Sequence, residues 1–594
     1  MCKKNGASPL YIAGQNGHIS AVKLLLSNKA DVNLCKEDKT SPLVIACENG
    51  HEEIVRTLLK HGADLNLCTS SGASPLFIAC QKGYNISAQL LIDKGAAVNM
   101  CMYNGDSPLY TACQNDHFST VKLLLSNKAY ANLGRKDKTS PLFFACQNEN
   151  ENLVQLLLDN GADINICDEN GASPLFIACQ KGYNKIVQLL LTTGANINLC
   201  TLEGFSPLVI ACENGHEETV RTLLKHGANV NLCTSSRISP LFIACKKGYN
   251  ISAQLLIDEG AVLNTCMYNG ASHLYVACEN NHISTVKLLL SNKADANLGR
   301  NDKISPLFFA CHNENENLVQ LLLDNGADIN IRDEDGASPL LMACQKGYNK
   351  IVQLLLTTGA NINLCTFNLG FSPLVMACEN GHEETVRTLL KHGAKVNLCT
   401  SSGISPLFIA CQKGYNISAQ LLIDEGAVVN MCMYNGASPL YVACENNHIS
   451  TVKLLLSNKA YANLGRKDKT SPLFIACHNG NENLVQLLLD NGADINICDE
   501  DGASPLLIAC QKGYNNIVQL LLTTGANINL CTFEGFSPLA LACEYGHKET
   551  VRTLLENRAN INIRTIKGTA EDIARQYGNE MIVQMLKKQH CKNN

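Results

Sequence analysis

The chain has 594 residues, of which 46% are hydrophobic, and its formal net charge is −5. Because no basic block stands out, the composition gives no electrostatic support for binding to nucleic acid or to a membrane surface. No apolar run approaches the ~18–20 residues of a membrane span, and the first residues lack the apolar core of a signal peptide. We therefore expect an intracellular protein, in the cytoplasm or the nucleus, without membrane insertion.

A repeat of 33 residues runs through the chain. The serine of a recurrent Ser-Pro pair marks it: fifteen of sixteen steps between these serines are 33 residues and one is 34, with the extra residue near Asn368-Leu369. We predict one array over 1–594 without linkers. Its predicted units are 3–35, 36–68, 69–101, 102–134, 135–167, 168–200, 201–233, 234–266, 267–299, 300–332, 333–365, 366–399, 400–432, 433–465, 466–498, 499–531, 532–564 and 565–594.

Unit 168–200 illustrates the elements predicted for each unit. Ser173 is suited to cap a first helix, and Pro174 occupies its first turn, where the missing N–H costs nothing. Gly182 ends this helix through a positive φ. An apolar stripe then predicts a second helix, which Gly194 ends, and turn-forming residues predict a hairpin-like loop. The stripe consists of Ile186, Val187, Leu190 and Leu191. Such a unit buries its helices only by stacking on its neighbours.

The period, the S-P-L-x-x-A step, the Gly215-His216 turn and the L-L-x-x-G-A-D-x-N ending together resemble ankyrin repeats. The resemblance covers essentially the whole chain. It implies an all-α fold, an ankyrin-repeat solenoid of stacked helix-turn-helix units with hairpin-like finger loops. It also implies a C-terminal cap over 565–594, where Thr569 begins the last first-helix motif.

Several residues depart from the family pattern. His273 replaces the proline of one unit and so loses a preset φ. Other departures replace a glycine that the pattern places at positive φ, where another residue is strained by about 1 kcal/mol. These are Glu149 and Glu314 in the turn between the helices, and Lys29, Lys128, Lys293 and Lys459 after the second helix. We predict lower local stability in these units.

A second period of five units lies over the first. Second-helix sequences recur every fifth unit, so that blocks 69–233, 234–399 and 400–564 are near copies of one another. We infer that the chain grew or shrank by whole units. A stack held by contacts between nearest neighbours tolerates such changes.

Thirty cysteines require an explanation, and sixteen of them follow the alanine of a first helix, from Cys47 to Cys543. Equivalent residues of stacked helices lie ~8–10 Å apart, whereas a disulfide needs Cα atoms within ~7 Å. No C-x-x-C spacing of a zinc site occurs, and a catalytic nucleophile repeated sixteen times is implausible. We interpret the helix cysteines as buried packing residues, and we expect the thirteen loop cysteines to be more exposed.

The Gly-His histidines are interpreted as structural residues that order the turn between helices. The paired glutamates that open second helices, such as Glu217-Glu218, suit the helix dipole better than they suit acid–base catalysis. No phosphate-binding loop or hydrolase motif is present. We therefore predict no enzyme activity, no cofactor and no metal.

The resemblance implies partner binding in the concave groove formed by the fingers and the first helices. Aromatic residues recur at the finger tips, and aromatic residues are favoured as interface anchors. The alternative is that these rings pack between neighbouring fingers. The candidate partner-binding residues are Tyr103, Phe205, Tyr268, Phe367, Phe371, Tyr434, Phe533, Phe536, Lys181 and Glu213.

The leading functional hypothesis is a non-catalytic scaffold or adaptor for protein–protein interactions. Because the blocks repeat, the array is suited to several copies of one motif or to a repetitive partner, with a gain in avidity. The alternative is a regulatory or substrate-recognition part of a larger signalling or ubiquitin-ligase assembly, or a fragment of a longer multidomain protein. The sequence does not identify the partner.

Overall fold

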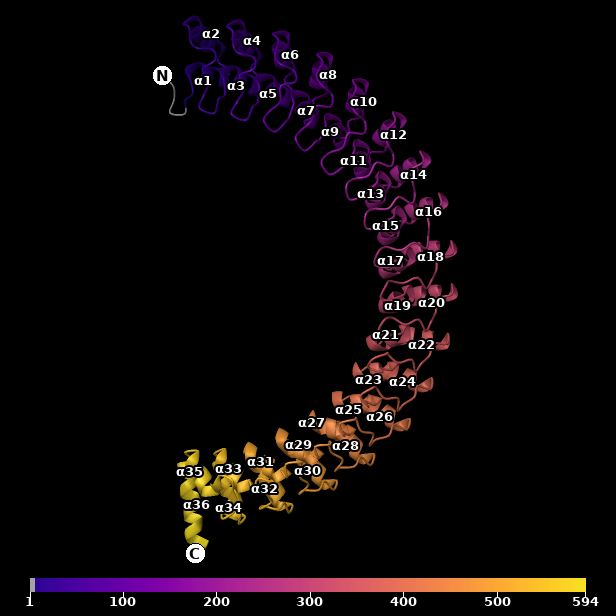
Figure 1. Cartoon of the computed structure of the whole chain (residues 1–594), viewed down its shortest axis with the longest axis vertical. Helices are drawn as coiled ribbons and strands as arrows, with labels where there is room; N and C mark the ends of the chain where they lie inside the picture. Colours follow the sequence, from indigo (N-terminus) through magenta and orange to yellow (C-terminus); the bar gives the residue numbers. More distant parts are fainter. Residues whose placement is uncertain (1–5, 594) are drawn as a thin grey trace. The chain divides into compact units, whose positions relative to one another are not determined.

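A computed structural model describes residues 6–593. These residues divide into two compact units, the first ending at Leu298 and the second beginning at Gly299. Each unit consists of helix pairs: every first helix packs against its own second helix and, within the unit, against the neighbouring first helices. Figure 1 shows the two rows of helices, with the connecting loops projecting beside the first helices.

The first helices are short, with seven or eight residues each. They are α1 (Pro9–Gln15), α3 (Pro42–Glu48), α5 (Pro75–Gln81), α7 (Pro108–Gln114), α9 (Pro141–Gln147), α11 (Pro174–Lys181), α13 (Pro207–Glu213), α15 (Pro240–Lys247), α17 (His273–Glu279), α19 (Pro306–His312), α21 (Pro339–Lys346), α23 (Pro373–Glu379), α25 (Pro406–Lys413), α27 (Pro439–Glu445), α29 (Pro472–Asn479), α31 (Pro505–Lys512), α33 (Pro538–Glu544) and α35 (Ala570–Gln576).

The second helices have nine residues, apart from the longer last one. They are α2 (Ile19–Ser27), α4 (Glu52–Lys60), α6 (Asn85–Asp93), α8 (Phe118–Ser126), α10 (Glu151–Asp159), α12 (Asn184–Thr192), α14 (Glu217–Lys225), α16 (Asn250–Asp258), α18 (Ile283–Ser291), α20 (Glu316–Asp324), α22 (Asn349–Thr357), α24 (Glu383–Lys391), α26 (Asn416–Asp424), α28 (Ile449–Ser457), α30 (Glu482–Asp490), α32 (Asn515–Thr523), α34 (Lys548–Glu556) and α36 (Glu580–Asn593).

The predicted limits of the first helix are confirmed in α11. The Phe176 N–H donates to Ser173 Oγ at 3.1 Å, and the equivalent serine caps have distances of 3.0–3.2 Å. This bond satisfies a donor that the helix leaves unpaired. Gly182 ends the helix with φ 76°. In α12 the apolar stripe points inward, because Ile186, Val187 and Leu190 are fully buried.

Seven histidines directly before second helices do more than order one turn, because each bridges two neighbouring repeats. His216 Nε2 lies 3.0 Å from the carbonyl oxygen of Gln180 in the preceding unit. The ring lies so close to Gly182 that a Cβ there would approach Nδ1 to 2.5 Å. Gly182 therefore provides both the positive φ and the space for the histidine of the next unit. Equivalent bridges come from His51, His117, His282, His382, His448 and His547.

The loops are finger-like turns with very little regular strand. The Thr201 N–H donates to the Phe205 carbonyl at 3.0 Å and closes the finger between α12 and α13. A two-stranded antiparallel sheet forms only near the C-terminal end of the described residues, between β1 (Arg564–Thr565) and β2 (Gly568–Thr569). Thr569 then caps α35 in a reciprocal arrangement with Asp572.

The strained positions expected from the sequence are confirmed, and further ones were missed. Glu149 and Glu314 have φ values of 59° and 55°. The four lysines after second helices also adopt positive φ: Lys29, Lys128, Lys293 and Lys459. The missed positions are Lys39, Lys138, Arg237, Lys303 and Lys469 at finger tips, Asp116, Asn281 and Asn447 in turns between helices, and Arg558 after α34.

His273 takes the first position of α17, where equivalent helices have proline. Its side chain is buried, with Nδ1 2.7 Å from the Leu263 carbonyl oxygen and Nε2 3.0 Å from Ser239 Oγ. Since a carbonyl only accepts, Nδ1 carries the proton and Nε2 accepts from the serine hydroxyl. Burial lowers the pKa of His273 to about 4, although the bond to the Leu263 carbonyl acts in the opposite direction. The sequence predicted only the loss of the φ that proline presets, whereas the structure shows that the histidine ring makes two hydrogen bonds in return.

The cysteines fall into the two expected groups. The sixteen helix cysteines are fully buried, and burial raises the pKa of each thiol far above its usual value, to about 12 for Cys543. Such thiols are inert packing groups. The described loop cysteines are partly exposed, and Cys233 is exposed. Most donate a weak hydrogen bond to the asparagine carbonyl two residues earlier, as Cys68 does to Asn66 at 3.3 Å. Cys2 lies outside the described residues.

Candidate partner-binding surface

We define the finger surface as the tips of the fingers together with the first helices beside them (Figure 1). At most of the described junctions, neighbouring fingers are joined edge to edge by one backbone hydrogen bond. The Leu202 N–H donates to the Asn170 carbonyl at 2.9 Å, and the Phe533 N–H donates to the Asp501 carbonyl at 3.1 Å. These bonds fix the register of the tips, so that side chains of adjacent fingers meet in a reproducible way.

Three of the candidate residues are tyrosines at equivalent tips, and all are exposed. Tyr103, Tyr268 and Tyr434 retain 68%, 65% and 69% of their full accessibility. Each ring also lies against the preceding finger. A Cβ on Gly72 would lie 3.1 Å from Tyr103 Cδ1 and one on Gly403 3.2 Å from Tyr434 Cδ1, and the Arg237 guanidinium carbon lies 4.6 Å from the centroid of the Tyr268 ring. Packing between fingers and availability for a partner are therefore compatible, because one edge of each ring packs on a finger while most of the ring faces solvent.

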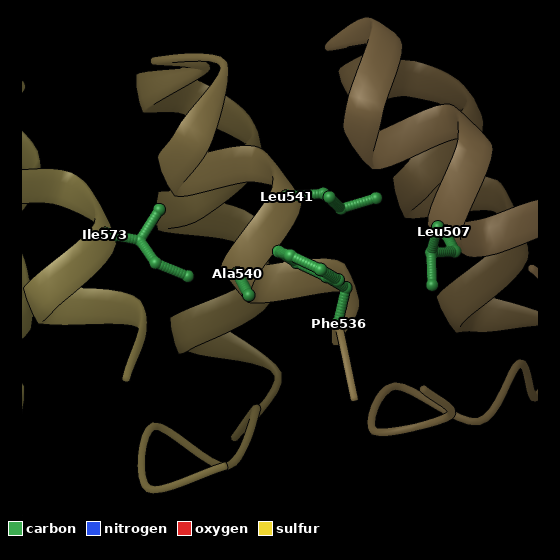
Figure 2. Packing of buried hydrophobic residues seen from close by; sticks show 5 residues of the cluster. All are labelled: Leu507, Phe536, Ala540, Leu541 and Ile573. Carbon is green, nitrogen blue, oxygen red and sulfur yellow. The ribbon is translucent and has the colours of Figure 1, made fainter. Parts of the chain in front are cut away.

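The phenylalanines divide by their place in the finger. Phe367 and Phe533, which directly follow the threonine that opens the finger, are 58% and 82% exposed. Phe205 and Phe371, just before the serine cap, are half-buried. The expectation of an exposed ring is wrong for Phe536, which is buried because it packs into an apolar cluster. Figure 2 shows its ring between Leu507 and Ala540.

Two neighbouring finger tips of each block carry opposite charges, a feature that the search for aromatic anchors missed. One finger of each block is basic, with Lys136 and Lys138 exposed in the first copy. The next finger is acidic, with Asp168 and Glu169 in the first copy. The Glu169 N–H donates to the Asp137 carbonyl at 2.9 Å, so the two fingers are direct neighbours. The third-block counterparts are Lys467 and Lys469, followed by Asp499, Glu500 and Asp501.

The single acidic residue within a basic finger stays ionised. Burial alone would raise the pKa of Asp468, but hydrogen bonds from the Thr470 hydroxyl and backbone N–H outweigh burial and hold that pKa below its usual value. Arg466 lies 3.7 Å from the same carboxylate. The exposed Lys467 and Lys469 therefore carry the positive charge that this tip presents.

An open cavity of about 530 Å³ lies on the finger surface near α31 and α33. Its floor is apolar, with Leu507, Phe536 and Leu541, and its rim is acidic. Four carboxylates and one ammonium group line it: Asp499, Asp501, Glu534, Glu544 and Lys567.

Two polar candidate residues lie at the ends of first helices. Lys181 is exposed at the end of α11, and Glu213 is half-buried at the end of α13. Glu544, which corresponds to Glu213, lines the cavity, whereas Lys512, which corresponds to Lys181, does not. The residue directly after the helix cysteine thus faces the finger surface in the third block.

Within residues 6–593, no cluster of three or more His, Cys, Asp or Glu side chains has the geometry to hold a metal ion. None of the described helices combines the length and apolar character that a membrane crossing requires.

Stacked helix pairs with fingers along one edge define a helical repeat protein. A family model described as ankyrin repeats (3 copies) matches residues 1–69, 61–137, 142–234, 231–302, 307–400, 374–468, 458–532 and 524–594. The chain therefore belongs to the ankyrin-repeat family, whose repeats generally act as protein-interaction modules. A search of curated proteins found no match.

Proposed function

We propose that the chain is a non-catalytic scaffold or adaptor that binds other proteins through its finger surface, at several blocks at once. One observation carries the proposal: exposed tyrosines occupy the same finger position in all three blocks, at Tyr103, Tyr268 and Tyr434. Large exposed aromatic side chains cost less conformational entropy to immobilise than long polar ones and are enriched at binding hot spots.

The periodic charges support multivalent binding. Each block presents a basic finger followed by an acidic one, so a partner with repeated opposite charges meets the same pattern every five units. Linking several weak contacts in one chain raises avidity well above the affinity of a single contact. We place the protein in the cytoplasm or the nucleus, where reducing conditions suit a chain with thirty cysteines.

Graded substitution in the full chain tests this proposal. A binding partner obtained by affinity purification would be titrated against variants with Tyr103→Ala, Tyr268→Ala and Tyr434→Ala, singly and together. Each substitution should weaken binding, and the triple variant should lose more than tenfold, because single hot-spot truncations cost roughly 1–2 kcal/mol.

Tyr130→Ala and Tyr461→Ala provide matched controls. Both tyrosines are 66% exposed, but they lie in the loops after α8 and α28 and not at finger tips. Equal losses for control and finger variants, or a triple variant with unchanged affinity, would rule out the finger surface as the binding site.

A further inference from the structure

One difference between the middle and third blocks lies directly before the acidic finger. Arg332 precedes the acidic finger of the middle block, and Cys498 takes its place in the third block. The Arg332 guanidinium lies over the Phe367 ring, with Cζ 3.9 Å from the ring centroid. Its Nε donates to the Gly336 carbonyl at 3.1 Å, and its Nη2 donates to the Cys365 carbonyl. The chain thus holds one of its own arginines in a site made by two neighbouring fingers.

The acidic finger of this site has the same local geometry in both blocks, whereas the aromatic finger of the middle block has one residue more, near Asn368-Leu369. Asp333 Oδ1 accepts from the N–H groups two and four residues later at 3.0 and 2.7 Å, and Asp499 Oδ1 does so at the same distances. The Phe367 N–H donates to the Asp335 carbonyl at 2.8 Å, as the Phe533 N–H does to Asp501 at 3.1 Å. The third block therefore rebuilds the acidic finger and the aromatic tip, without the arginine.

The aromatic ring of the third block is also the more open of the two. Phe533 is 82% exposed, whereas Phe367 under its arginine is 58% exposed. The carbonyl groups that correspond to those of Gly336 and Cys365 belong to Gly502 and Cys531. Neither of these two carbonyls accepts a hydrogen bond from within the described part of the chain.

The charges around Phe533 favour a cation. Lys567 lies 2.7 Å from Glu544 and 3.0 Å from the Tyr577 hydroxyl, so that ammonium group already has its partners. In residues 6–593, neither Asp501 nor Glu534 makes an ion pair. A basic side chain that enters the cavity therefore meets uncompensated negative charge as well as an aromatic face.

We propose that the cavity at Phe533 binds an arginine side chain of a partner protein, in the way that Phe367 holds Arg332. Arginine fits better than lysine, because only a planar guanidinium can stack on the ring and also donate to two carbonyl groups. The apolar floor of Leu507, Phe536 and Leu541 takes a neighbouring aliphatic side chain of the same extended segment (Figure 2). This inference rests on the proposed function and specifies the chemistry of one partner segment.

The test uses the full chain and a defined probe, a Gly-Leu-Arg-Leu-Gly peptide with a trifluoroacetyl group, observed by fluorine NMR. The control peptide has glutamine in place of arginine. Wild type should bind the arginine peptide and not the control. Phe533→Ala should weaken binding roughly two- to fivefold, the range expected for an exposed cation–π contact.

Two exchanges between the blocks make the test specific. Cys498→Arg places the chain's own arginine over Phe533 and should weaken binding by about tenfold or more, since it removes both the ring face and the carbonyl acceptors. Cys498→Ala controls for loss of the thiol and should bind like wild type. Arg332→Cys should uncover Phe367 and add a second bound peptide.

Equal binding of both peptides, an unchanged affinity in Cys498→Arg, or no binding of the arginine peptide by wild type would each overturn the inference. Partner binding that depends on the finger tyrosines but not on Cys498→Arg would leave the proposed function intact and refute only the arginine site. A partner that ignores all finger variants would refute the proposed function itself.

Discussion

Block 234–399 and block 400–564 are near copies, and four of the places where they differ act as natural exchange experiments. The middle block has Arg237, His273, Glu314 and Arg332 where the third block has Gly403, Pro439, Gly480 and Cys498. None of these exchanges falls on the buried stripe of a second helix. They lie at finger tips, at the start of a first helix or in a turn.

This distribution shows what a stack of repeats tolerates. A buried leucine such as Leu389 packs between layers, and its loss would cost roughly 2–5 kcal/mol. The exchanged residues instead alter local backbone strain, one buried hydrogen-bond pair and two cation–π contacts. Because stability in a repeat array is a sum of unit and neighbour terms, each exchange should be measurable locally.

The exchange of His273 and Pro439 should have the largest effect, and that effect should depend on pH. The pKa of His273 is lowered to about 4 by burial, whereas an unfolded histidine titrates near pH 6.5. Above about pH 6.5 the ring is neutral in both states and its stabilising contribution is fully present. The free energy of unfolding falls as the pH drops from there towards 4. The loss should reach about 3 kcal/mol in acid, as local hydrogen exchange over α17 would measure.

His273→Pro should remove this acid sensitivity in the middle block. Pro439→His provides the reverse exchange, because Ser405 and Val429 stand where Ser239 and Leu263 support His273. If hydrogen exchange over α17 has the same pH dependence in wild type and His273→Pro between pH 7 and 4.5, the buried neutral histidine is not its cause.

The repeated features of the fold were predictable because they depend on local chemistry. A serine cap, a proline in the first turn and a glycine at the helix end act within a few residues, and the period repeats them throughout the chain. The candidate surface was only partly predictable. Phe533 and Phe536 are three residues apart, yet the first ring is exposed and the second is buried. Phe533 lies at the finger tip, whereas Phe536 lies at the base of the finger and packs against the first helices.

Contacts between fingers could not be read from the sequence. Arg332 and Phe367 meet only because a backbone hydrogen bond sets the register of two fingers. The positive φ of Asp116 and Lys39, by contrast, was predictable, because the 33-residue period aligns these residues with Gly83 and Gly72. The basic and acidic residues of each block are evident in the sequence, but only the structure shows that the basic finger and the acidic finger are neighbours in space.

The exchange of Glu314 and Gly480 should have an intermediate effect. Glu314 adopts φ 55° in the turn after α19, and Gly480 adopts φ 74° after α29, which is one residue longer. Glu314→Gly should raise local stability by about 1 kcal/mol, because it relieves a left-handed conformation that side chains disfavour. Hydrogen exchange over 306–324 would measure the gain.

Gly480→Glu should cost at least as much in the third block, because a Cβ there would lie 2.9 Å from Tyr514 Cζ and the ring must shift. Glu314→Ala is the matched control, since it keeps the strained backbone and changes only the side chain. Equal protection in Glu314→Gly and Glu314→Ala would show that backbone strain does not limit stability in this turn.

The exchange of Arg237 and Gly403 should have the smallest net effect, because two contributions oppose each other. Arg237 is strained by its φ of 61°, but its guanidinium lies 4.6 Å from the centroid of the Tyr268 ring. Arg237→Gly relieves about 1 kcal/mol of strain and forfeits about 0.5–1 kcal/mol of cation–π attraction, so local stability should barely change. Arg237→Ala keeps the strain and loses only the attraction, which should lower stability by about 0.5–1 kcal/mol. Hydrogen exchange of the finger amides in the two variants separates these contributions, and a stability loss in Arg237→Gly as large as in Arg237→Ala would mean that the left-handed backbone carries no cost here.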